Sequence, residues 1–186
     1  MNIENIIKGR RSIKRFEERD VSPELIKELL DIAVWAPNHR MTEPWRFIMF
    51  HGEGKEKLAS IVRQMKESKE SDPAKKKSEG EKIYNKLMSN PMFVMVVMKE
   101  DPNLVTREED FAATSCVLQN FSLLAWEKGI GMTWHSYGWL QDSMVREALG
   151  IQPGERAIAN MHIGYPAMLP KERERKNMND LLTVFQ

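Results

Sequence analysis

The sequence has few of the features that would cross-link a small protein, anchor it in a membrane or bind a metal. Its 186 residues include a single cysteine, Cys116, so an internal disulfide is excluded. No apolar run approaches the roughly 20 residues that a membrane-spanning helix needs. The N-terminus lacks the apolar segment and the small-residue cleavage site of a signal peptide. We therefore expect a cytoplasmic protein whose residues 1–186 form one domain.

The chain also lacks a large excess of either positive or negative charge. Lys and Arg total 28 against 27 Asp and Glu, which gives a formal net charge of +1. Such a balance argues against a broad surface for nucleic acid or anionic lipid, although a local basic pocket remains possible. The aromatic residues are scattered and form no evident stacking platform for single-stranded nucleic acid.

Several catalytic and binding motifs are missing. Residues 129–134 (GIGMTW) begin like a dinucleotide fingerprint, but Trp134 replaces the third glycine and the segment follows a helix. Residues 52–55 (GEGK) lack the spacer of a P-loop, and no serine lies in a G-x-S-x-G elbow. The histidines have no metal-ligand spacing: they are His39, His51, His135 and His162. We interpret His51 and His162 as structural, whereas the other two lie beside unusual residues.

The pattern of elements predicts a layered α+β domain, because helices and strands are mixed without regular alternation. The clearest helix start is Ser22-Pro23-Glu24, a capping serine with proline at the first helical position, and Pro37 ends that helix. Further helices are expected at residues 3–9, 108–128 and 142–149, buried strands at 45–50, 92–98 and 157–165, and a strand or extended segment at 132–137.

Three segments carry more specific expectations. Residues 55–69 look helical and exposed, and the almost wholly polar residues 66–82 predict an exposed helical excursion or long loop, either solvated or acting as a lid. Cys116 lies in an apolar helix pattern and is expected in the core. The apolar tail, residues 179–186, should dock either on its own core or on a second subunit.

The most informative segment is residues 10–15 (RRSIKR), at the end of the first expected helix. Guanidinium groups donate paired hydrogen bonds to phosphate oxygens, and a serine hydroxyl adds another donor. The segment therefore predicts a phosphorylated ligand. Two further distinctive segments follow at residues 35–40 (WAPNHR) and 43–47 (EPWRF).

These segments, together with Gly129-Ile130-Gly131-x-x-Trp134 and residues 163–166 (IGYP), resemble the FMN-dependent nitroreductase family, especially its small bacterial branch. The resemblance covers nearly the whole chain in the same order and spacing. It implies an α+β fold with a mainly antiparallel central sheet flanked by helices. It also implies an intertwined homodimer with two FMN sites at the subunit interface.

The resemblance to this family implies roles for individual residues of the chain. The resemblance implies that Arg10, Arg11 and Ser12 hold the FMN phosphate and the pyrimidine end of the ring. It implies that Trp35 and His39 reach the flavin from the partner subunit. It also implies that Trp134, His135 and Ser136 form a second flavin-contacting segment, and residues 124–129 fall where similar proteins have a nicotinamide contact.

The implied activity is an FMN-dependent oxidoreductase that takes hydride from NADH or NADPH and reduces nitroaromatics, quinones or activated alkenes in a ping-pong cycle. A flavin-binding protein with little turnover is the main alternative, and an interaction protein without flavin is a weaker one. The sequence departs from the family at Glu43, where many members have Gln. Arg173 and Arg175 alternate with acids and are interpreted first as a solvated segment.

Overall fold

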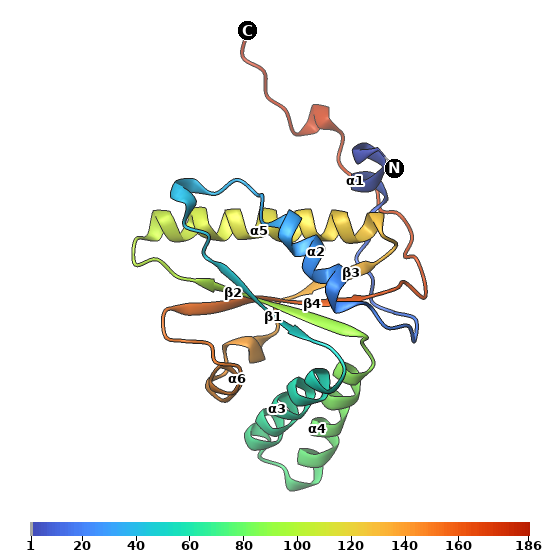
Figure 1. Cartoon of the computed structure of the whole chain (residues 1–186), viewed down its shortest axis with the longest axis vertical. Helices are drawn as coiled ribbons and strands as arrows, with labels where there is room; N and C mark the ends of the chain where they lie inside the picture. The colour runs from blue at the N-terminus through green and yellow to red at the C-terminus, as the bar shows by residue number, and fades with distance from the viewer. Residues whose placement is uncertain (1) are drawn as a thin grey trace.

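The computed structural model describes residues 2–186. Four strands form one antiparallel sheet in the order β1-β2-β4-β3 (Figure 1). Their bounds are β1 Trp45–Phe50, β2 Met92–Lys99, β3 Gly131–His135 and β4 Glu155–Gly164. The helices are α1 Ile3–Gly9, α2 Pro23–Ala33, α3 Glu53–Lys69, α4 Pro73–Met88, α5 Leu104–Glu127 and α6 Ser143–Ala148. Short 3-10 turns lie at His39–Met41 (η1), Gly138–Gln141 (η2) and Met178–Asp180 (η3).

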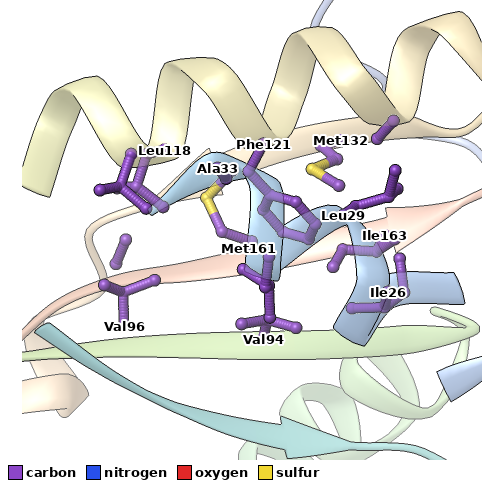
Figure 2. Close-up of a cluster of buried hydrophobic side chains, with 14 of the residues drawn as sticks. Ile26, Leu29, Ala33, Val94, Val96, Leu118, Phe121, Met132, Met161 and Ile163 are labelled. Carbon is purple, nitrogen blue, oxygen red and sulfur yellow. The ribbon is translucent and has the colours of Figure 1, made fainter. Parts of the chain in front are cut away.

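Helices cover the sheet on both faces, so the fold is the predicted layered α+β arrangement. Helices α2 and α5 lie on one face, and α3, α4 and α6 lie on the other (Figure 1). On the α5 face the core joins α2, α5 and the sheet (Figure 2), as shown by Ile26, Leu29, Val94, Val96, Leu118, Phe121, Met161 and Ile163. The central strand β2 is buried on both faces, as its continuous apolar run predicts.

The helix starts follow from local capping. Ser22 caps α2 by accepting a hydrogen bond from the Leu25 amide at 3.2 Å, and Pro23 occupies the first turn as expected. Helix α5 begins at Leu104, four residues earlier than predicted. Asn103 caps it, since its side chain accepts from the amides of Val105 and Thr106.

Three expectations about burial need correction. Strand β1 is an edge strand, and only Phe50 in it is fully buried. Helix α3 is not simply exposed, because Leu58 and Val62 on one of its faces have no exposed surface. Cys116 is exposed on the outward face of α5 rather than in the core.

Residues 66–82 are helical rather than loop, since they comprise the end of α3, a short connection and the start of α4. Most of them are exposed, as expected. The two helices pack closely at Gly80, where an added Cβ would lie 2.6 Å from the Glu67 Cγ. The apolar tail does not dock on its own core: Leu181 and Leu182 are exposed and Phe185 is 94% exposed.

Candidate functional site

The arginine-rich segment lies along the free edge of β3. Ser12 forms a parallel bridge with Met132, and the Ile13 amide donates to the Met132 carbonyl at 3.0 Å. The Thr133 hydroxyl donates to the Ile13 carbonyl from the same strand. Ile13 is fully buried over Gly131, where an added Cβ would lie 2.8 Å from the Ile13 Cβ. This anchoring fixes the residues on either side of Ile13 against the sheet.

A pocket of about 580 Å³ opens beside this segment. Its wall combines the N-terminal segment with the residues that follow β4 and carries seven basic side chains and no acidic one: Arg10, Arg11, Lys14, Arg15, Lys171, Arg173 and Arg175. Ser12 and Thr133 add hydroxyl groups. In a chain of net charge +1, this concentration of cations favours the binding of an anion.

The two leading arginines have different surroundings. Burial, with the guanidinium groups of Arg11 and Arg175 close by, lowers the pKa of Arg10, so a bound anion would relieve the crowding of positive charge. Arg11 is already engaged. Its Nη1 donates to the carbonyls of Lys8 at 2.5 Å and Arg10 at 3.0 Å, and its Nη2 lies 3.3 Å from Glu172. Arg10 is therefore the freer guanidinium for an anion.

A second pocket, of about 570 Å³, shares Lys14 and Arg15 with the first and continues toward α4. Lys86 of α4 and His135 of β3 lie in its wall, and the buried His162 of β4 also lines it. The Lys86 ammonium is 5.4 Å from the centre of the Tyr137 ring, and the His135 ring stacks on the same tyrosine at 4.7 Å. The two pockets together form one elongated, cation-lined site.

Both imidazoles in the second pocket are neutral near pH 7. Burial, reinforced by Lys86 and Lys14, lowers the pKa of His135. Burial, reinforced by His135 and Lys86, lowers the pKa of His162 to about 3. The positive charge of this pocket therefore resides on its lysines and arginine and not on its histidines.

The other two members of the predicted flavin segment lie beside His135. The Trp134 indole Nε1 donates to the Ser136 hydroxyl at 3.0 Å. The Trp134 side chain is 38% exposed, although it comes from a sheet strand. The structure thus brings Arg10, Arg11 and Ser12 to one end of the elongated site and His135 to the other, whereas Trp134 and Ser136 are not among the residues that line the two pockets.

Comparison with known proteins agrees with this architecture. The model of the nitroreductase family matches residues 7–165. The chain belongs to the nitroreductase family. It is 42% identical over 182 residues to the Bacillus subtilis protein named "Putative NAD(P)H nitroreductase YfhC", an alignment that covers 97% of this chain and 93% of that protein.

Solved structures show the same nitroreductase fold. The nitroreductase-like family protein from Bacillus cereus superposes with a TM-score of 0.90 at 35% identity, over 100% of this chain and 97% of that one. NfnB from sphigopyxis sp. strain HMH, described as an FMN and NADPH-dependent nitroreductase, has a TM-score of 0.75 at 17% identity and full coverage of both chains. At that identity the likeness to NfnB shows the fold alone.

Two predicted site residues, Trp35 and His39, do not line this pocket. Trp35 follows α2 and is 89% exposed, and His39 starts η1, where its Nδ1 lies 2.7 Å from Glu109 Oε2 on α5. The arginine segment follows α1, whose last residue Gly9 packs near Trp126 at the other end of α5. Residues 109 and 126 are about 25 Å apart along a helix that rises 1.5 Å per residue. One chain therefore does not bring His39 to its own pocket, and Trp35 is not among the residues that line it.

Other residues of the pocket were not assigned from the sequence. Arg173 and Arg175 line the first pocket, although alternation with acids favoured a solvated segment. Lys86 carried no motif, and only the fold places it beside His135. Glu43, where many family members have Gln, has a positive φ of 41° and forms no ion pair within residues 2–186.

Other kinds of site are not found in the described part of the chain. Residues 2–186 contain no group of three or more potential metal ligands. None of the described helices is both long and apolar enough to cross a membrane.

Proposed function

We propose that this nitroreductase-family protein is an FMN-dependent oxidoreductase with NADH or NADPH as its electron donor. The observation that carries the proposal is the elongated pocket, which is strongly cationic at one end and joins histidine and aromatic rings to lysines at the other. Family membership and the NAD(P)H nitroreductase name of the relative from Bacillus subtilis support it.

The residues present fit a flavin mononucleotide. A phosphate suits the first pocket, where Arg10, Arg173 and Arg175 supply charge and Ser12 supplies a hydroxyl donor. Arg11 would contribute charge while it holds the end of α1. The ring would then lie along Trp134, His135 and Ser136 toward the second pocket, where Lys14 and Lys86 lie.

The chain's own residues would bind the cofactor, orient its ring and compensate its negative charge. When bound, FMN supplies the hydride-transfer chemistry, and we propose a ping-pong cycle with nitroaromatics, quinones or activated alkenes as acceptors. Lys14 and Lys86 would stabilise the negative charge of the reduced cofactor electrostatically. Because the histidines of this pocket have lowered pKa values, they would not contribute a competing charge near neutral pH.

We further propose that the site is completed by a second copy of the chain. Trp35 is exposed, and His39 is held at the far end of α5, so both are available to the pocket of another molecule. No charged residue occurs between Phe111 and Trp126, although Phe111 and Cys116 on this stretch are exposed. An uncharged outward helix face is typical of a buried helix, and the exposed apolar tail offers additional surface for the same partner.

The dimer is tested by placing a charge on this face. Ala112→Glu should convert a dimer to a monomer in sedimentation velocity and weaken FMN binding. The matched control is Lys27→Glu on the exposed surface of α2, which should leave both unchanged. A wild-type monomer that binds FMN with full affinity would contradict the composite site.

The flavin assignment is tested by titrating the purified protein with FMN and then adding NADH or NADPH without oxygen. The bound flavin spectrum should bleach with at least one donor. Arg10→Ala should weaken FMN binding at least tenfold, since charged hydrogen bonds contribute about 1.5–3 kcal/mol each. Lys27→Ala is a control that removes a cation elsewhere. Unchanged flavin affinity in Arg10→Ala would refute the phosphate assignment.

A flavin-binding protein with little turnover is the second candidate. It predicts a bound flavin spectrum that persists with both donors. A folded protein that binds no FMN would contradict both candidates.

A further inference from the structure

A buried hydrogen-bonded pair, Asn90 and His162, lies in the wall of the second pocket. Asn90 is in the connection between α4 and β2, and His162 is on β4; they are 7% and 4% exposed. The His162 Nδ1 lies 2.9 Å from the Asn90 Oδ1. Neither residue belongs to the motifs that point to the flavin, and His162 was interpreted from the sequence as merely structural.

The surroundings of Asn90 determine which nitrogen of His162 carries the proton. The Asn90 Nδ2 donates to the carbonyls of Lys86 at 2.8 Å and Leu87 at 3.4 Å, so the Oδ1 must be the atom that faces His162. An amide oxygen only accepts, and the His162 Nδ1 must therefore donate. The Nε2 is left as an acceptor, 3.4 Å from the Tyr137 hydroxyl. His162 is thus held as a single neutral tautomer.

The same asparagine ties this histidine to the end of α4. Its two carbonyl acceptors belong to the last turn of α4, and one of them is the carbonyl of Lys86 itself. The Lys86 side chain reaches from that turn to the ring of Tyr137. Any shift of Asn90 is therefore passed to the backbone of the lysine that lines the pocket.

His162 also supports the pocket from the side of the sheet. Its ring centre is 4.2 Å from that of His135, and Phe93 of β2 packs edge-on against it at 4.8 Å. His135 in turn stacks on Tyr137, the ring that Lys86 contacts. The pair consequently connects three walls of the pocket, namely α4, β3 and β4.

We propose that Asn90 and His162 are positioning residues: their hydrogen bond fixes the last turn of α4 against the sheet and so holds Lys86 where it stabilises negative charge in the pocket. This inference rests on the proposed flavin site and deepens it, since it assigns part of the tuning of the bound cofactor to two residues that act through Lys86. Removal of the hydrogen bond, with the fold intact, should move Lys86 away from the pocket.

Two substitutions at one position separate this role from simple packing. His162→Asn retains a donor at the position of Nδ1 but removes the ring. His162→Phe retains a ring but removes the donor. If the hydrogen bond positions Lys86, the asparagine variant should behave like the wild type and the phenylalanine variant should not. A packing role predicts the reverse order.

The first readout is the midpoint potential of bound FMN. A cation that withdraws from about 4 to about 6 Å at an effective dielectric constant of about 20 changes the preference for the reduced over the oxidised cofactor about tenfold. For a two-electron couple, tenfold corresponds to about 30 mV. His162→Phe should lower the potential by about this amount, and His162→Asn should leave it within about 10 mV of wild type.

A double-mutant cycle tests whether the effect passes through Lys86. Lys86→Met should lower the potential by itself, and His162→Phe should then add little to it. Equal shifts from His162→Phe in both backgrounds would overturn the proposal, as would a wild-type potential in His162→Phe.

A second readout needs no flavin. Nitrogen NMR of the flavin-free wild type should show His162 as the Nδ1–H tautomer, and the Lys86 side-chain protons should show the ring-current shift of Tyr137. That shift should be lost in His162→Phe and kept in His162→Asn. The opposite tautomer, or an unchanged Lys86 shift in His162→Phe, would overturn the proposal. Failure of the wild type to bind FMN would instead refute the proposed function, and the flavin-free spectra would still decide the position of Lys86.

Discussion

Mild acid should destabilise this protein through His162 at pH values where most carboxylates are still ionised. Burial, with His135 and Lys86 close by, lowers the pKa of His162 to about 3, against about 6.5 in an unfolded chain. Between these pH values the unfolded chain binds a proton that the native imidazole does not bind. The free energy of unfolding must therefore fall as the pH falls from about 6.5 toward about 3.

The size of the effect follows from the difference between the two pKa values. One pKa unit corresponds to about 1.4 kcal/mol, so His162 should cost about 2.7 kcal/mol at pH 4.5 and about 5 kcal/mol once it is protonated in both states. These are large fractions of the roughly 5–15 kcal/mol that stabilises a typical domain. Well above pH 6.5 this cost disappears, because the imidazole is then neutral in both the folded and the unfolded state.

Urea unfolding at pH 7.0 and pH 4.5, followed by tryptophan fluorescence at one protein concentration, measures the effect. The comparison is with His162→Asn, which keeps the hydrogen-bond donor but does not titrate. The wild type should lose about 2–3 kcal/mol more than the variant between the two pH values. His135 is present in both proteins, so its own lowered pKa largely cancels in the comparison. Equal losses would refute the conclusion that His162 is neutral in the native protein.

Two further predictions concern the framework of the sheet. Gly131→Ala would place a Cβ about 2.8 Å from the Cβ of the buried Ile13. It should lower the free energy of unfolding in urea by about 1–3 kcal/mol and weaken FMN binding in a spectral titration. The control is Gly54→Ala, whose added Cβ meets no atom within 4 Å, and it should be neutral or stabilising. Arg46→Met would break the two-point contact with Glu155, at 2.7 and 2.6 Å, and should cost about 1 kcal/mol at pH 7 because the arginine is partly exposed. Since Arg46 lowers the pKa of Glu155, this cost should shrink below about pH 4.5, and a cost independent of pH would contradict the role of the ion pair.

Local sequence signals predicted much of the fold. The capping serine and the proline after it placed the start of α2 correctly, because that signal requires only the next three residues. The apolar run of β2 was correctly assigned to a central strand, since it is buried on both faces. Asn103 is also a local cap, but it was overlooked, and α5 was therefore predicted to begin too late.

Burial was harder to predict, because an apolar pattern does not say what covers it. Cys116 lies on an uncharged stretch of α5 and was expected in the core, yet it faces outward from the chain. In α3 the error was opposite, since its many charges concealed a fully buried face that includes Leu58. Sequence periodicity identifies an apolar face, but only the packing of the other elements shows whether the same chain covers it.

In the candidate site, too, local motifs could be predicted, whereas contacts between distant parts of the sequence could not. Arg10 and Ser12 could be assigned because their motif is contiguous and lies beside a helix end. The pairing of Asn90 with His162 joins residues 72 positions apart in the sequence, and it depends on the register of β2 against β4. No local pattern contains that register, and the contribution of Arg175 to the first pocket likewise follows from the path of the chain after β4.

The length of α5 gives a reason for a composite site. The arginine segment lies near Trp126 at one end of this helix, whereas His39 is held by Glu109 toward the other. Because an α-helix is stiff, no local adjustment brings groups about 25 Å apart along it into one pocket. If His39 contacts a flavin, that flavin must be bound by another copy. We therefore expect loss of the dimer to remove part of each flavin site, rather than to separate two complete ones.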